Sequence, residues 1–193
     1  MNPTKILVFA GSIRTGALSA KLAALAAKEL ALADADVTQI SLADYPLPIY
    51  DGNLEAEKGV PENANKLARL IVANDGVFIA TPEYNHSLPP LLKNAIDWVS
   101  RIRHTGTMAY RHKAYAIGGT SDGPIGGARA LADLRKVLAT ALGAIIVPEK
   151  IEIVRAQNAF DEAGELIDEV PAKNLKSLTR RLVDLARRLS AAG

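Results

Sequence analysis

The sequence contains no cysteine, which excludes disulfide bonds, thiolate nucleophiles, iron–sulfur clusters and cysteine zinc sites. It also lacks any uncharged apolar run of about 18 residues, the length that a membrane-spanning helix needs. Residues 1–5 lead directly into a short apolar segment, without the apolar region and cleavage site of a signal peptide. We therefore expect a cytoplasmic protein without a membrane partner.

A strong excess of one charge is missing too, because 23 lysines and arginines are balanced by 21 aspartates and glutamates. The net charge of +2 is far below the basic excess typical of nucleic-acid-binding proteins, so no nucleic-acid partner is expected. Hydrophobic residues make up 49% and charged residues 23% of the chain, an ordinary globular mixture. The length of 193 residues then favours one domain, residues 1–193.

Short apolar runs typical of buried parallel strands alternate with longer segments of helical periodicity. The expected strands are 6–9, 37–40, 76–80, 114–117 and 144–147, and the expected helices are about 18–30, 61–74, 90–100, 128–142 and 172–190. Gly143 is the expected C-terminal cap of the fourth helix. Segment 44–53 is rich in proline, glycine and aspartate, which predicts a long loop.

Five strands separated by helices predict an α/β fold with a doubly wound parallel sheet. The simplest arrangement is the flavodoxin-like order 2-1-3-4-5, with helices on both faces. In such a sheet a ligand binds at the carboxyl ends of the strands, where the strand order reverses. The loops after strands one, three and four are therefore the candidate site.

The loop 11–19 leads into a helix N-terminus, where free N–H groups and the helix dipole favour an anion. Its hydroxyl groups, guanidinium and two glycines suit a terminal phosphate. The alternative interpretation is a tight turn at Gly11 and Gly16, with Ser19 satisfying the helix end. Neither a Walker loop nor a Rossmann glycine fingerprint is present, which disfavours ATP hydrolysis and a Rossmann-bound dinucleotide.

The loop 81–90 presents the flat face of Tyr84 beside the amide of Asn85, on a backbone restricted by prolines. A planar heterocycle would fit there. The glycines of loop 118–127 let the backbone approach a ligand closely. Glu83 has two interpretations, a general base or a structural ion pair or hydrogen bond, and we favour the structural one.

Three other classes of protein are disfavoured by particular residues. Segment 119–123 matches the Gly-x-Ser-x-Gly nucleophile elbow around Ser121, but a hydrolase triad needs a histidine after the serine. The three histidines, His86, His104 and His112, all precede it and lack metal-ligand spacing. A receiver domain needs an aspartate after the first strand, where this chain has Ala10 and Gly11.

Four strings of the sequence resemble motifs of the NADPH-dependent FMN reductase family, particularly its chromate and quinone reductase branch. They are Gly11-Ser12-Ile13-Arg14, Thr81-Pro82-Glu83-Tyr84-Asn85, Leu92-Lys93-Asn94-Ala95-Ile96-Asp97-Trp98 and Ile125-Gly126-Gly127-Ala128-Arg129. The second and third are the most specific, because two unusual strings lie at a fixed spacing in one expected βα unit. The likeness covers essentially the whole chain.

The resemblance implies a flavodoxin-like subunit that binds FMN through all three loops. Its phosphate would be held by Ser12, Arg14 and Ser19 and by the backbone near Ala17 and Leu18. Its ring would be bordered by Pro82, Glu83, Tyr84 and Asn85, and approached from the fourth strand by Gly119 and Ser121. Relatives commonly have serine at position 17 and asparagine at position 19, so we expect weakened phosphate affinity and partial loss of FMN on purification.

The resemblance also implies the activity of an NAD(P)H-dependent FMN or quinone reductase. Flavin N5 would take hydride from NADPH or NADH and pass two electrons to a quinone, flavin, azo compound or chromate by a ping-pong mechanism. No catalytic side chain is then expected, because FMN carries the chemistry. The alternative is a non-catalytic, flavodoxin-type electron carrier, which a strongly acidic surface would favour and the net charge of +2 does not.

Family members form dimers or tetramers in which a neighbouring subunit helps to wall the site. In this chain the segment 48–53 is the candidate wall. Tyr45, Leu47, Ile49 and Tyr50 form an apolar group on a proline-ordered loop, and we expect them to be exposed and suited to an interface. A homodimer or homotetramer is therefore predicted.

Overall fold

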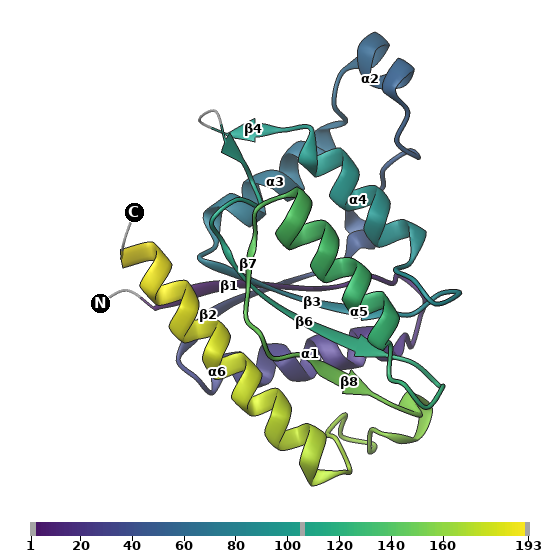
Figure 1. The fold of residues 1–193 in the computed structure, drawn as a ribbon, viewed down its shortest axis with the longest axis vertical. Coiled ribbons are helices and arrows are strands. Elements are labelled where there is room, and N and C mark those ends of the chain that lie inside the picture. The colour runs from purple at the N-terminus through teal and green to yellow at the C-terminus, as the bar shows by residue number, and fades with distance from the viewer. Residues whose placement is uncertain (1–2, 105–106, 192–193) are drawn as a thin grey trace.

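The computed structural model describes residues 3–104 and 107–191 and has a parallel β-sheet at its centre (Figure 1). The sheet order is β2-β1-β3-β6-β7, and β8 also pairs with β6. Its strands are β1 (Thr4–Ala10), β2 (Ala35–Ile40), β3 (Gly76–Pro82), β6 (Ala114–Thr120), β7 (Ile145–Ile146) and β8 (Ile151–Ile153). The predicted order 2-1-3-4-5 is confirmed, with a sixth strand added.

Helices cover both faces of the sheet, as predicted (Figure 1). One face carries α1 (Leu18–Ala31) and α6 (Glu169–Ala191), and the other carries α3 (Glu62–Ala73), α4 (Pro90–Ser100) and α5 (Ala128–Arg135). Along β1, Ile6 and Val8 pack on the first face, while Leu7 and Phe9 pack on the second. Burial on both faces is why this strand is an uninterrupted apolar run. Among the described residues, no helix combines the length and apolarity needed to cross a membrane.

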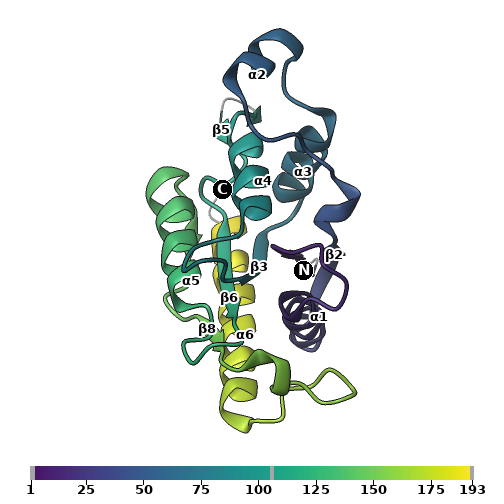
Figure 2. The same ribbon diagram turned by 90° about the vertical axis from the view of Figure 1, so that its right-hand side faces the viewer.

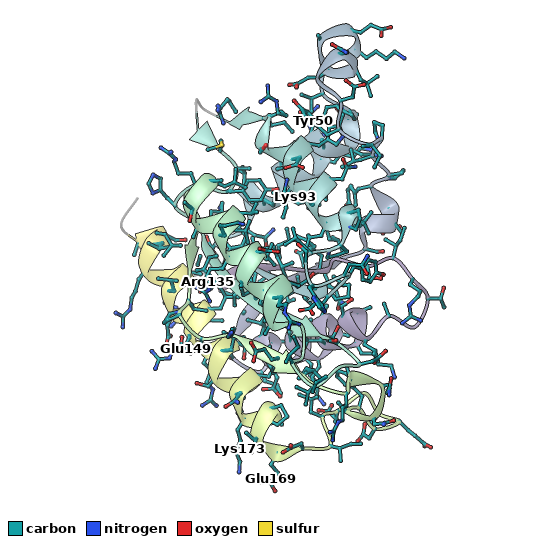
Figure 3. The ribbon with its side chains drawn as sticks, turned by 45° about the vertical axis from the view of Figure 1, so that its right-hand side comes forward. Tyr50, Lys93, Arg135, Glu149, Glu169 and Lys173 are labelled. Atoms are coloured by element: carbon teal, nitrogen blue, oxygen red, sulfur yellow. The ribbon has the colours of Figure 1, made fainter. Side chains whose placement is uncertain are left out.

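The fifth strand is divided into two short pieces rather than running over 144–147. β7 pairs with Ala114 and Tyr115, and β8 rejoins β6 opposite its last three residues. Pro148 lies between the pieces and has no N–H to donate to the sheet. The guanidinium of Arg135 donates to the carbonyls of residues 147, 148 and 149 at 3.0, 3.4 and 3.5 Å, which holds the linking segment (Figure 3).

The helix predicted over 128–142 begins as α5 and continues as a π-helical segment, η2 (Lys136–Ala141). It ends at Gly143, whose φ of 71° is left-handed, so the predicted C-terminal glycine is confirmed. The N–H of Gly143 donates to the carbonyl of Ala139, and that of Ala144 to the carbonyl of Leu138. Other short elements that escaped prediction are the antiparallel pair β4 (Arg103–His104) and β5 (Thr107–Met108), and η3 (Ala156–Asn158).

The predicted loop 44–53 contains the end of a single-turn helix, η1 (Leu42–Asp44), and the beginning of α2 (Gly52–Lys58). We call residues 48–58 the arm. The arm projects from the body of the molecule in both views, and no residue of α2 is buried (Figures 1 and 2). Helix α2 forms because the carboxylate of Asp51 accepts from the N–H of Asn53 at 2.8 Å and caps its N-terminus. The loop prediction is therefore wrong at its C-terminal end.

Two residues of the Leu-Lys-Asn-Ala-Ile-Asp-Trp string in α4 hold the base of the arm. The indole Nε1 of Trp98 and the amide Nδ2 of Asn94 both donate to the carbonyl of Pro48, at 2.7 and 2.9 Å. The amide Oδ1 of Asn94 accepts from the N–H of Tyr50 at 2.8 Å. The Tyr50 ring packs edge-on against Trp98, with 5.0 Å between ring centroids. The arm is thus anchored by directed contacts.

A second group of contacts holds the far side of the arm. The Tyr50 hydroxyl donates to Glu55 at 2.9 Å, and the Arg101 guanidinium donates to the same carboxylate. These hydrogen bonds, Arg101 foremost, lower the pKa of Glu55. The expected exposure of four apolar side chains is correct only for Ile49, which is 75% exposed. Tyr45 and Leu47 pack against the core, and Tyr50 packs against Trp98.

Candidate functional site

Three loops at the carboxyl ends of β1, β3 and β6 surround a cavity of about 290 Å³, at the edge of the sheet where the strand order predicts a ligand. Its lining residues are Ser12, Arg14, Ala17, Leu18, Ser19, Pro82, Glu83, Tyr84, Thr120, Ser121, Asp122 and Gly123. All predicted site residues except Asn85 and Gly119 are among them. Three lining residues were not named as site residues from the sequence, although the loop 118–127 that contains them was part of the candidate site. They are Thr120, Asp122 and Gly123.

One part of the cavity lining, the start of α1, presents hydrogen-bond donors without partners. Ser19 is 1% exposed, and its Oγ makes no hydrogen bond within the described part of the chain. Ala17, the N-cap residue, provides no side-chain bond, and no acidic residue lies in the first turn. The first N–H groups of a helix have no partner within it. An unpartnered buried hydroxyl costs about 1–3 kcal/mol. This part of the lining therefore suits an anion that accepts several hydrogen bonds, such as a phosphate.

Another part of the lining, the loop after β3, forms a tight hairpin. The N–H of Tyr84 donates to the carbonyl of Ser87, and the N–H of Ser87 donates to the carbonyl of Tyr84, both at 3.0 Å. The two central residues, Asn85 and His86, have φ values of 48° and 64°. Left-handed conformations at both positions are typical of a type I′ turn. Tyr84 is 46% exposed and lines the cavity, while Asn85 lies at the exposed tip of the turn.

Glu83 is engaged with the start of α5. Its Oε2 accepts from the backbone N–H groups of Arg129 and Ala130 at 3.0 and 3.2 Å, and its Oε1 lies 3.7 Å from the Arg129 guanidinium. The Glu83 side chain is only 6% exposed. These contacts give Glu83 the structural role that the sequence favoured over that of a general base.

The described contacts of Ser121 are those of a turn residue rather than those of a nucleophile paired with a histidine. Its Oγ accepts from the N–H of Gly123 at 3.1 Å, and its backbone bonds to Ile153 and Ala156. In the part of the chain that the structure describes, no hydrogen bond joins Ser121 to His86 or His112. The side chain of His104 lies outside the described residues. The nucleophile-elbow match is therefore a turn, stabilised by the serine hydroxyl.

Gly119 lies in β6, and its lack of a side chain serves packing within the protein. A Cβ at Gly119 would lie 2.8 Å from the carbonyl oxygen of Gly126. The close approach of the β6 terminus to the start of α5 explains this glycine. The sequence pattern had suggested approach to a ligand, but Gly119 does not line the cavity.

A larger groove of about 570 Å³ lies between α6 and residues 147–148, which directly follow β7. It is lined mainly by α6, which contributes five exposed lysines and arginines, and it includes none of the loops after β1, β3 and β6. The smaller cavity is the better ligand site, because it combines buried donors with the loops at the strand ends. Among the described residues, no cluster of three histidine, aspartate or glutamate side chains could hold a metal ion.

Comparison with known proteins identifies the family. Residues 4–158 match the family described as NADPH-dependent FMN reductase. A quinone reductase from Escherichia coli (strain K12) is 38% identical over 168 residues, 86% of each chain. An NAD(P)H-dependent FMN reductase from Pseudomonas aeruginosa is 34% identical over 186 residues, 96% of each chain. The solved structure of FerB, a flavoenzyme NAD(P)H:(acceptor) oxidoreductase from Paracoccus denitrificans, gives a TM-score of 0.77 at 32% identity, covering 96% of this chain and 98% of that one. The chain therefore belongs to the NADPH-dependent FMN reductase family, as an oxidoreductase that uses FMN and NAD(P)H.

Proposed function

We propose that the protein reduces a small acceptor, a quinone in the first instance, with electrons from NAD(P)H. The observation that carries this proposal is a single cavity lined both by the unpartnered phosphate-type donors at the start of α1 and by Tyr84. When FMN is bound, its N5 supplies the hydride-accepting centre. Membership of a reductase family favours an enzyme over the non-catalytic carrier that the sequence left as the alternative.

The side chains have distinct roles in this proposal. Those of Ser12, Arg14 and Ser19, with the backbone of Ala17 and Leu18, hold the phosphate of FMN. The ring is bordered by Pro82, Glu83, Tyr84 and Asn85, and approached from the end of β6 by Ser121. Gly119 acts indirectly, by letting β6 pack closely against Gly126. We treat residues 1–193 as one FMN-binding domain, located in the cytoplasm, where NAD(P)H is supplied.

The choice of quinone rests on relatives named as quinone reductases. Free flavin, an azo compound and chromate are further candidate acceptors. Steady-state rates with NADPH and NADH, each against this panel, test the choice. We expect the highest kcat/KM with a quinone, and a higher value with any other acceptor would replace it.

The kinetics should be those of a shared site, and Ser121→Ala should retain most of its turnover. Nicotinamide and acceptor need the same planar surface, so they must bind in turn, and double-reciprocal plots should be parallel. Because Ser121 is not a nucleophile in this mechanism, the variant with FMN at saturation should stay within about tenfold of the native rate, whereas loss of a nucleophile costs about 10³-fold or more. Intersecting plots, with turnover abolished in a variant that still holds FMN, would contradict this mechanism.

We also propose a homodimer or homotetramer in which the arm of one protomer helps to wall the cavity of another. Asn94, Trp98 and Arg101 anchor the arm. The arm projects from the body of its own protomer and presents the exposed Ile49. Ile49→Asp should weaken association at least about tenfold, because burial of an isoleucine contributes about 1.5–3 kcal/mol. Light scattering over a concentration series measures this effect.

Ile167→Asp is the matched control, since Ile167 is 64% exposed and lies outside the arm. Its association should equal that of the native protein. A native protein that is fully active as a strict monomer would contradict the proposed assembly.

A further inference from the structure

The start of α5 cannot provide its own N-terminal cap. Its N-cap residue is Gly127, with a φ of 85° and no side chain. A Cβ at this position would lie 3.1 Å from the backbone nitrogen of Thr120 and 3.2 Å from the Cα of Gly119. The side chains that cap helices best, those of serine, threonine, aspartate and asparagine, would therefore be strained here. The first turn of α5 also contains no acidic residue.

Glu83 provides the missing cap from 46 residues earlier in the chain. Its carboxylate accepts from the second and third N–H groups of α5, those of Arg129 and Ala130. These are the groups that an N-cap side chain normally satisfies. The negative charge also lies at the positive end of the helix dipole, where it is favourable. The end of β3 is thus joined to α5 by two charge-assisted hydrogen bonds.

A second contact joins the same hairpin to the same helix. The hydroxyl of Ser87 donates to Oδ2 of Asp133 at 2.6 Å, one turn beyond Arg129. Between Glu83 and Ser87 lies the turn with left-handed residues at both central positions. Tyr84 begins this turn and lines the cavity. The wall that carries Tyr84 is therefore fixed to α5 at both ends.

We propose that Glu83 and Ser87 are positioning residues that hold Tyr84 in place before a ligand enters the cavity. A wall that is already ordered loses less conformational entropy when a ligand binds. The affinity for the ligand group that contacts this wall is therefore higher. The part of the ligand recognised here is a planar ring rather than its phosphate, because Tyr84 offers an aromatic face, whereas the phosphate-type donors belong to a different loop, the one that leads into α1. The identity of that ring rests on the proposed FMN function, whereas the fixed wall does not.

Amide hydrogen exchange in the flavin-free protein tests the fixed wall by itself. Glu83→Ala should accelerate exchange at the amides of Arg129, Ala130 and Tyr84 by about tenfold or more, since bonds to a charged group are lost. Glu83→Gln keeps an acceptor and should show a smaller acceleration. Arg129→Ala is the matched control, because it removes the ion pair but keeps the backbone N–H, and its exchange should match the native protein. Unchanged exchange in Glu83→Ala would overturn the proposal.

Dissociation constants for FMN and riboflavin then test the consequence for binding. Ser87→Ala should weaken the binding of FMN and of riboflavin by the same factor, about 5- to 20-fold, and because Ser87 does not line the cavity, this loss acts through the wall. A general loss of stability would not raise both dissociation constants, because the Ser87→Ala protein is measured well below its melting temperature and stays folded. A loss of affinity for FMN alone, or no loss of affinity for either flavin, would overturn the positioning role. If the native protein binds neither flavin but the exchange pattern holds, the proposed function fails while the fixed wall stands.

Discussion

Trp98→Ala should lower the free energy of unfolding by about 3–5 kcal/mol and release the arm. Trp98 is fully buried, so alanine leaves a cavity in the layer between α4 and the arm. The change also removes the indole donor to the Pro48 carbonyl and the ring against which Tyr50 packs. Urea unfolding followed by circular dichroism measures the stability. Limited trypsin cleavage at Lys58 reports release of the arm.

Trp98→Phe is the control that separates packing from hydrogen bonding. Phenylalanine fills most of the same volume, and the Asn94 amide still donates to the Pro48 carbonyl. We therefore expect a loss of only about 1–2 kcal/mol and slow cleavage at Lys58. If Trp98→Ala costs less than about 1 kcal/mol and leaves Lys58 as protected as in the native protein, Trp98 does not anchor the arm.

Arg14→Ala should weaken FMN binding by about 10- to 150-fold, while riboflavin binding should hardly change. The guanidinium lines the cavity on the same loop as Ser12, near the free donors of α1. Charge-assisted hydrogen bonds to a phosphate contribute about 1.5–3 kcal/mol, which gives the expected range. Riboflavin lacks the phosphate and so lacks this contact. Fluorescence titration of each flavin measures both dissociation constants.

Arg187→Ala is the matched control, because Arg187 is exposed on α6 and does not line the cavity. It removes the same charge from the protein and should leave both dissociation constants unchanged. Equal losses for FMN and riboflavin in Arg14→Ala would place Arg14 away from the phosphate.

The sheet order was predictable because its signals are local. Runs such as 6–9 and 76–80 are apolar without interruption, as strands buried on both faces must be. Once five strand-like segments, of which 37–40 is partly polar, alternate with helices, few arrangements remain, and each one places the ligand at the strand ends. The position of the cavity and most of its lining residues followed from this reasoning.

The features that escaped prediction depend on distant partners or on weak local signals. The division of the fifth strand rests on Pro148 and on the hydrogen bonds from Arg135. Helix α2 has seven residues and none that is buried, so it has no apolar periodicity to detect. The partners of Glu83 lie 46 and 47 residues away, and no local pattern could name them. Asn85 was the one available signal for the hairpin, because asparagine tolerates a left-handed conformation.

Titration of FMN fluorescence with the flavin-free protein tests most directly whether the cavity binds FMN. We predict saturable quenching at micromolar protein, with one flavin per chain, and weaker quenching of riboflavin because the donors near Ser19 then lack a phosphate. Absence of quenching at micromolar protein would contradict FMN binding at the carboxyl ends of β1, β3 and β6.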